Sequence, residues 1–122
     1  MFNNIFVIEQ IESKHWFETR NIGGGCPPIE TDKGWLIIYH AVDDMDKGRT
    51  YRAGAALLDK NDPTKVIGHH HNPLFSPDKE YELKGNIPNV VFPTGSAVFG
   101  KRLYIYYGAA DESIAVVSMD LN

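Results

Sequence analysis

Two parts of this chain share one pattern of apolar and polar residues. In each, a run of β-branched and aromatic residues ends in small residues and an aspartate, and a second apolar run follows. The first copy comprises residues 35–43 and 51–59, and the second comprises residues 103–111 and 113–120. Short apolar runs separated by turn signals about every 8–12 residues predict antiparallel β-strands. No stretch keeps a helical period over about three turns, so the pattern predicts an all-β fold.

The segments between these runs add shorter strands and turns. Residues 5–8 and 65–69 predict short strands, and residues 32–34 (Asp-Lys-Gly) are typical of a hairpin turn. Two further segments, at residues 27–28 and 89–95, contain prolines, which cannot donate to a strand ladder. We therefore expect them to form irregular strands at an edge or an inner position of a sheet.

The repeat also predicts the architecture. A strand unit that recurs at this interval favours a β-propeller, in which several similar units close into a ring. The two units cover approximately residues 23–85 and 86–122, within a single domain that spans residues 1–122. Two units are too few to close a ring, so the sequence predicts a partial propeller.

Composition and charge exclude several classes of function. The 122 residues are 43% apolar and 23% charged, as in a soluble globular protein, and the net charge is −4. Dispersed Lys and Arg residues give no basic surface for nucleic acid, and no apolar run approaches the roughly 18 residues of a membrane span. The single cysteine, Cys26, excludes an internal disulfide, and residues 1–9 lack the features of a signal peptide. We therefore expect a cytoplasmic protein.

Five ordered motifs resemble a known family. They are residues 22–29 (IGGGCPPI), 34–42 (GWLIIYHAV), 51–59 (YRAGAALLD), 88–93 (PNVVFP) and 106–111 (YYGAAD). Together they resemble glycoside hydrolase family 130, the mannoside phosphorylases and related mannosidases. The resemblance implies a five-bladed β-propeller with its active site at one end of the central channel. It covers nearly the whole chain but only the C-terminal part of the family's domain, about two to two and a half blades.

The resemblance implies an inverting phosphorolysis of β-mannosides that releases mannose 1-phosphate. Inorganic phosphate would be the co-substrate, and no cofactor is expected. The family's proton donor is an aspartate from the N-terminal part of the propeller, and neither Asp43 nor Asp111 is its counterpart. We therefore assign no catalytic residue, expect the chain to be inactive alone, and leave open whether it is an enzyme.

Two residues match family positions near the phosphate. His40 ends the first strand of the first copy, and the family uses this position around phosphate and substrate. Arg52 begins the next strand, and its planar guanidinium suits bidentate phosphate binding. A structural histidine and an inter-blade ion pair are the respective alternatives.

Four further residues are candidates for contact with the sugar. Asp111 resembles the family's aspartate that hydrogen-bonds the mannosyl unit, and Asp43 is its equivalent in the repeat. The alternatives are a turn-forming aspartate at position 111 and loop capping at position 43. Phe92 and Tyr107 offer apolar ring faces to a sugar, although aromatic residues of β-repeats more often lie in the core.

Three other features suggest chemistry less strongly. Residues 69–71 are three consecutive histidines, but neighbouring strand residues point to opposite faces and do not converge on one ion. We expect a solvated loop there and no metal site. Cys26 has no paired cysteine and is predicted to be a buried thiol. The glycines at 23–25 predict a turn beside the channel, because no helix follows them to make a phosphate-binding loop.

Two other functions remain open. The chain could be a non-catalytic carbohydrate-binding or assembly module, or part of a β-mannosidase that hydrolyses its substrate. A partial propeller exposes strand edges and inter-blade faces, which favours association. We therefore expect a homo-oligomer or a complex with a complementing N-terminal half, and a β-mannoside or other carbohydrate and phosphate as small partners.

Overall fold

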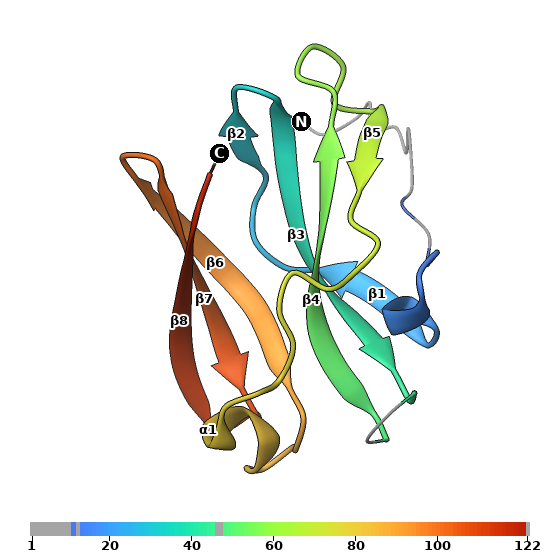
Figure 1. Cartoon of the computed structure of the whole chain (residues 1–122), viewed down its shortest axis with the longest axis vertical. Coiled ribbons are helices and arrows are strands. Elements are labelled where there is room, and N and C mark those ends of the chain that lie inside the picture. Colours follow the sequence, from blue (N-terminus) through green and yellow to red (C-terminus); the bar gives the residue numbers. More distant parts are fainter. Residues whose placement is uncertain (1–10, 12, 46–47, 122) are drawn as a thin grey trace, which may run out of the picture.

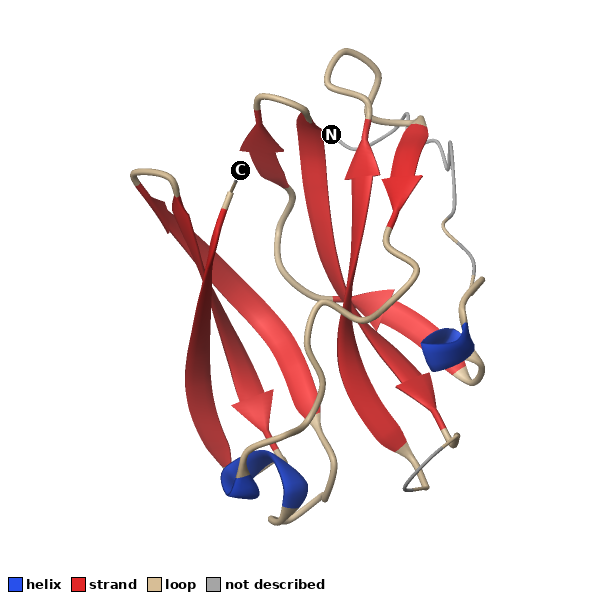
Figure 2. Ribbon diagram, viewed as in Figure 1, coloured by secondary structure: helices blue, strands red, loops and turns tan. Residues whose placement is uncertain are grey.

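The computed structural model describes residues 11, 13–45 and 48–121, and these form two antiparallel β-sheets (Figures 1 and 2). The elements, in chain order, are η1 (Trp16–Glu18), β1 (Asn21–Gly24), β2 (Ile29–Thr31), β3 (Gly34–Asp43), β4 (Thr50–Leu58), β5 (Val66–His69), α1 (Glu80–Leu83), β6 (Val91–Phe99), β7 (Arg102–Ala109) and β8 (Ser113–Asp120). The strand expected at residues 5–8 lies outside the described residues. The described part of the chain contains no helix that could cross a membrane.

The first sheet has the strand order β1-β3-β4-β5, and β2 pairs with the same strand as β1 does. Its centre is the β3–β4 hairpin, which pairs continuously from Trp35 with Leu58 to Asp43 with Thr50. The β-branched and aromatic residues of the first repeat unit form this hairpin, as the pattern predicts. β1 and β2 pair with different parts of β3, because the Pro27-Pro28 segment between them cannot donate to the ladder.

The second sheet has the order β6-β7-β8, and its strands come from the second repeat unit. Gly100, with a φ of 63°, turns β6 into β7. Ala110 and Asp111, with φ of 51° and 54°, turn β7 into β8, and the Glu112 amide closes this turn on the Ala109 carbonyl at 3.1 Å. Two successive residues of positive φ are typical of a type I′ turn, which non-glycine residues rarely occupy.

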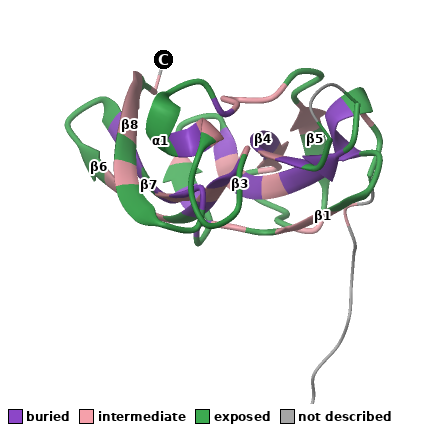
Figure 3. Cartoon of the chain, turned by 90° about the horizontal axis from the view of Figure 1, so that it is seen from below, coloured by how far each residue is buried: buried purple, intermediate pink, exposed green. Residues whose placement is uncertain are grey.

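The main core lies between the two sheets. Ile29 and Ile38 of the first sheet pack with Leu103 and Ile105 of the second, and Cys26 joins the same cluster. Figure 3 shows the buried residues concentrated along β3 and β4, whereas β8 is mostly exposed or half-buried. Two sheets that share a core across their faces are arranged as neighbouring propeller blades would be.

The opposite face of the first sheet is covered by the segment that precedes it. Phe17 of η1 is fully buried with Tyr39, Ala41 and Ala56, which project from β3 and β4. The short 3₁₀ helix of this segment supplies an apolar anchor for the sheet. The first sheet is therefore covered on both faces.

Local structure differs from the sequence pattern in two places. The glycine turn expected at residues 23–25 is in part a strand, because Gly23 and Gly24 pair with His40 and Tyr39 of β3. Residues 80–83 form the single helical turn α1, which the sequence pattern did not predict. The Glu82 carboxylate accepts hydrogen bonds from the amides of Asp78 and Lys79, at 2.8 and 2.9 Å, and so closes this turn at its N-terminus.

Candidate functional site

A pocket of about 340 Å³ opens where the start of β4 meets the second sheet. It combines apolar side chains, two hydroxyls and one carboxylate. Its lining residues are Tyr51, Ile87, Val90, Phe92, Thr94, Gly108 and Asp111. The Tyr51 amide donates to the Asn89 carbonyl at 2.9 Å, which fixes the first sheet against the segment that enters β6. The pocket therefore lies at a junction between the two sheets.

Phe92 connects this pocket to His40. The two rings are stacked, with centroids 4.4 Å apart and an interplanar angle of 24°. Tyr51 lies against both rings, at 6.0 Å from His40 and 6.1 Å from Phe92. The structure thus brings two predicted site residues, His40 and Phe92, into one aromatic group beside the pocket.

The hydrogen bond of His40 defines its chemistry. Its Nδ1 lies 3.0 Å from the Gly24 carbonyl oxygen, which can only accept, so Nδ1 carries the proton. Burial lowers the pKa of His40, although the bond to Gly24 partly opposes this effect. The ring is therefore neutral near pH 7, and its Nε2 is an acceptor that suits a hydroxyl group better than an anion.

Asp111, like Phe92, is a predicted sugar contact that lines the pocket. Its positive φ places it in the tight turn after β7, and its side chain is exposed. The Asp111 carbonyl accepts a hydrogen bond from Asn86 Nδ2 at 3.0 Å, which holds the turn. Among the described residues, no hydrogen bond or ion pair involves its carboxylate. The turn-forming alternative and a sugar contact are thus compatible at this residue.

Asp43 and Arg52 form a different cluster. Arg52 Nε donates to Asp43 Oδ2 at 2.8 Å, and the two side chains are 10% and 0% exposed. Asp43 Oδ1 also accepts the Met45 amide at 3.0 Å, which is the loop-capping role given as its alternative. The assignment of Asp43 to the sugar is therefore corrected, because its carboxylate is buried and occupied within the protein.

Arg52 does not share a site with His40. Ala41 lies opposite Arg52 and Ala53 lies opposite His40 in the β3–β4 ladder, so Arg52 and His40 project from opposite faces of the sheet. The Arg52 guanidinium also lies over the Trp16 ring, 5.0 Å from its centroid. This arrangement corresponds to the ion-pair alternative, and it does not bring the two predicted phosphate ligands together.

Tyr107 is a core residue. It is 3% exposed, packs edge-on against Phe75 and donates its hydroxyl hydrogen bond to the buried Glu82. Burial, and then the bond to the Glu82 carboxylate, raise the pKa of Tyr107. The alternative reading of Tyr107 as a core aromatic therefore holds, and its assignment to the sugar is corrected.

Two neighbours of the site, Tyr51 and Gly23, were not among the predicted site residues. Tyr51 lies opposite Val42 in the β3–β4 ladder, so it projects from the same face of the sheet as His40. Arg52, the next residue, projects from the other face. Gly23 lies beneath the His40 ring, where a Cβ would stand 2.5 Å from Nε2. The strand register would have indicated both, but the register was not known from the sequence. Cys26 is buried as expected, and burial raises the pKa of its thiol.

A family model described as β-1,4-mannooligosaccharide phosphorylase matches residues 2–122. The chain belongs to glycoside hydrolase family 130. It is 46% identical over 105 residues to a 1,2-β-oligomannan phosphorylase of Thermoanaerobacter sp. (strain X514), covering 86% of this chain and 34% of the relative. The chain thus spans about a third of the length of such relatives. This family 130 chain accordingly forms part of a propeller-type fold, with two antiparallel sheets as its blades.

Solved structures agree with this assignment. The β-1,2-mannobiose phosphorylase from Listeria innocua, in complex with β-1,2-mannobiose, superposes with a TM-score of 0.79 at 42% identity. That match covers 86% of this family 130 chain and 29% of the other. A second solved structure comes from work on members of this family that hydrolyse β-1,2-mannosidic linkages in Candida mannan. It superposes with a TM-score of 0.77 at 30% identity. It covers 88% of this chain and 32% of the other.

Proposed function

We propose that this chain supplies sugar-contacting residues of an inverting β-mannoside phosphorylase. The observation that carries the proposal is the pocket between the sheets, where the Asp111 carboxylate and the Phe92 ring line one cavity. Carboxylates accept hydrogen bonds from sugar hydroxyls, and an aromatic ring offers an apolar face. His40, stacked on Phe92, adds a neutral acceptor at Nε2.

The chain is proposed to bind rather than to catalyse by itself. An inverting mechanism needs an acid that protonates the leaving oxygen while the nucleophile attacks the opposite face of the sugar. Among the described residues that line the pocket, Asp111 is the carboxylate present, and its role here is to bind hydroxyls. The acid would come from a part of the propeller that these residues do not provide.

Phosphate is proposed as the co-substrate because several relatives are phosphorylases by name. We assign the anion to no described side chain. Arg52 is committed to Asp43 and Trp16, and His40 is a neutral acceptor. Hydrolysis, as in the family members that act on Candida mannan, is therefore the second form of the same proposal.

The test measures the binding of methyl β-mannoside to the chain by saturation-transfer NMR. Loss of a charge-assisted hydrogen bond, worth about 1.5–3 kcal/mol, predicts that Asp111→Asn weakens binding by roughly 10- to 100-fold. The matched control is Glu112→Gln, which removes one charge from the adjacent exposed residue and should leave affinity unchanged. Equal affinities for wild type and Asp111→Asn would contradict the proposal.

An assembly role is the second candidate, and one surface favours it. β8 is the edge strand of its sheet in the described structure, and Ile114 and Val116 project from it with exposures of 84% and 51%. Tyr106 lies opposite Val116, and Phe99 of β6 is also exposed. An apolar face beside an open edge favours association with a second copy. Sedimentation velocity should show a species larger than the monomer, and a compact monomer at all concentrations would exclude this role.

A further inference from the structure

Two histidines and a glutamate meet on the face of the first sheet that lies away from the pocket. His15 directly precedes η1, Glu18 ends that helix, and His69 ends β5. One donor atom from each residue lies within 4.8 Å of the other two. Tyr39 of β3 contacts this cluster, because its hydroxyl donates to Glu18. His40, the next residue, projects from the other face of the sheet toward Phe92. The cluster is therefore separated from the proposed sugar site by the sheet.

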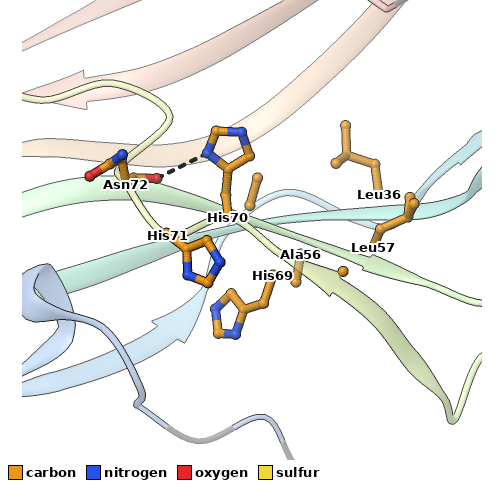
Figure 4. A pocket seen from close by; sticks show the side chains of 9 residues that line it. Leu36, Ala56, Leu57, His69, His70, His71 and Asn72 are labelled. Atoms are coloured by element: carbon orange, nitrogen blue, oxygen red, sulfur yellow. Dashed lines mark hydrogen bonds between the residues drawn. The ribbon is translucent and has the colours of Figure 1, made fainter.

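Two members of the histidine triplet, at the end of β5 and just after it, face this cluster. Figure 4 shows the rings of His69 and His71 on one side of the backbone and the ring of His70 on the other, where His70 Nδ1 lies 3.2 Å from the Asn72 carbonyl oxygen. The ring of His15 lies edge-on to the rings of His69 and His71, with centroid distances of 4.5 and 5.0 Å. The three consecutive imidazoles do not converge, but two of them face a third histidine from a distant segment.

Glu18 is a buried anion within this group. Its Oε1 accepts the Lys14 and His15 amides at 2.7 and 3.1 Å, and its Oε2 accepts the Tyr39 hydroxyl. His69 Nε2 lies 3.2 Å from the same Oε2. In the described structure, no Lys or Arg side chain pairs with Glu18, which is 0% exposed. A buried carboxylate without a permanent cationic partner is costly, and a cation would offset that cost.

His15 supplies a second and independent indication of a ligand. Its Nε2 is buried and has no hydrogen-bond partner within the described residues. A buried nitrogen left unsatisfied costs about 1–3 kcal/mol, and such groups in native structures often mark the place of an ion or water. An imidazole is mostly neutral at pH 7, so this nitrogen can offer a lone pair.

We propose that His15, Glu18 and His69 bind a divalent transition-metal ion of the Zn²⁺ type, which ties η1 to β5. Two imidazole nitrogens and one carboxylate oxygen are a donor set that zinc accepts. Ligand atoms of a tetrahedral zinc lie about 3.4 Å apart. The three donor atoms lie within 4.8 Å of one another, so each pair needs to close by about 1.4 Å or less. The exposed His71 or a water molecule completes the coordination.

Binding requires one proton to move. The ion takes the place of the hydrogen on His69 Nε2, and in the neutral ring this hydrogen passes to Nδ1, so no net proton is released. Tyr39 keeps its hydrogen bond to Glu18 and orients the carboxylate behind the ion.

The test is calorimetric titration of the chelator-treated full chain with Zn²⁺ in a phosphate-free buffer, together with thermal melts followed by circular dichroism. We expect one ion per chain, micromolar or tighter affinity, and a rise in melting temperature that EDTA reverses. His69→Ala and His15→Ala should each weaken binding at least about tenfold. The matched control is His70→Ala, which removes the exposed neighbouring imidazole and should bind like wild type.

Three results would overturn the proposal. One is a folded wild-type chain that shows no saturable Zn²⁺ binding. Another is a His69→Ala variant that is folded by circular dichroism and binds as tightly as wild type. The third is a His70→Ala variant that loses as much affinity as His69→Ala, since surface imidazoles would then account for the binding.

Discussion

Asp43 and Arg52 form a buried ion pair across the β3–β4 hairpin, with Arg52 Nε 2.8 Å from Asp43 Oδ2. The pair lies on the face of the sheet opposite His40, because neighbouring strand residues alternate between faces. Trp16 stacks on the guanidinium and closes the cluster. The pair therefore belongs to the packing of η1 and the first sheet, rather than to the pocket that Asp111 lines.

This arrangement predicts that Asp43→Asn destabilises the protein. Removing one member of a buried pair leaves the other charge poorly compensated, which costs on the order of 3 kcal/mol. Asp44→Asn is the matched control, because Asp44 pairs with Arg20 at the surface, where a pair contributes about 1 kcal/mol or less. Urea unfolding of both variants measures the difference. Equal losses of unfolding free energy would argue against a buried role for Asp43.

Gly23→Ala should disrupt the aromatic group beside the pocket. A Cβ at position 23 would stand 2.5 Å from His40 Nε2, so the ring must leave its place on Phe92. We expect a loss of about 1–3 kcal/mol in unfolding free energy and weaker binding of methyl β-mannoside. Gly24→Ala is the control, since no atom lies within 4 Å of a Cβ there. If the two variants bind and unfold alike, the His40–Phe92 stack does not support the pocket.

Tyr107→Phe separates a core role from a binding role. The variant removes the hydroxyl that donates to Glu82 and leaves that buried carboxylate one partner short, a loss of about 1–3 kcal/mol. Sugar affinity should not change. Tyr106→Phe, at the adjacent and more exposed tyrosine, should alter neither quantity. A Tyr107→Phe variant that keeps its stability but loses sugar binding would show that Tyr107 contacts the sugar.

The lowered pKa of His40 predicts a pH dependence of stability. Because burial lowers this pKa in the folded state, the unfolded chain takes up the proton first as the pH falls below about 6.5. The contribution of neutral His40 is therefore fully present above that pH and declines below it, until the folded-state pKa is passed. His40→Gln should reduce the slope of unfolding free energy against pH between about 5 and 7, relative to wild type. An unchanged slope would show that His40 does not titrate differently in the two states.

Local patterns were enough to predict the strands and the family. The β-branched and aromatic runs of residues 35–43 and 103–111 form β3 and β7, because such side chains pack well on a pleated, partly buried sheet. The helical turn at residues 80–83 was missed, because Glu82 stabilises it through a buried contact with Tyr107 from a distant strand. Intrinsic propensity carries no information on such a contact.

The candidate site shows the same division. The amino-acid sequence by itself determined an all-β repeat and the resemblance to family 130, and it named Asp111, Phe92 and His40 as candidate site residues. It could not determine which face of the sheet each side chain occupies, because a shift of one residue in register reverses every face. Only the tertiary structure placed His40 with Phe92, buried Asp43 with Arg52, and brought His15 and Glu18 to His69. These groupings depend on packing between segments far apart in the chain, which no local pattern of residues encodes.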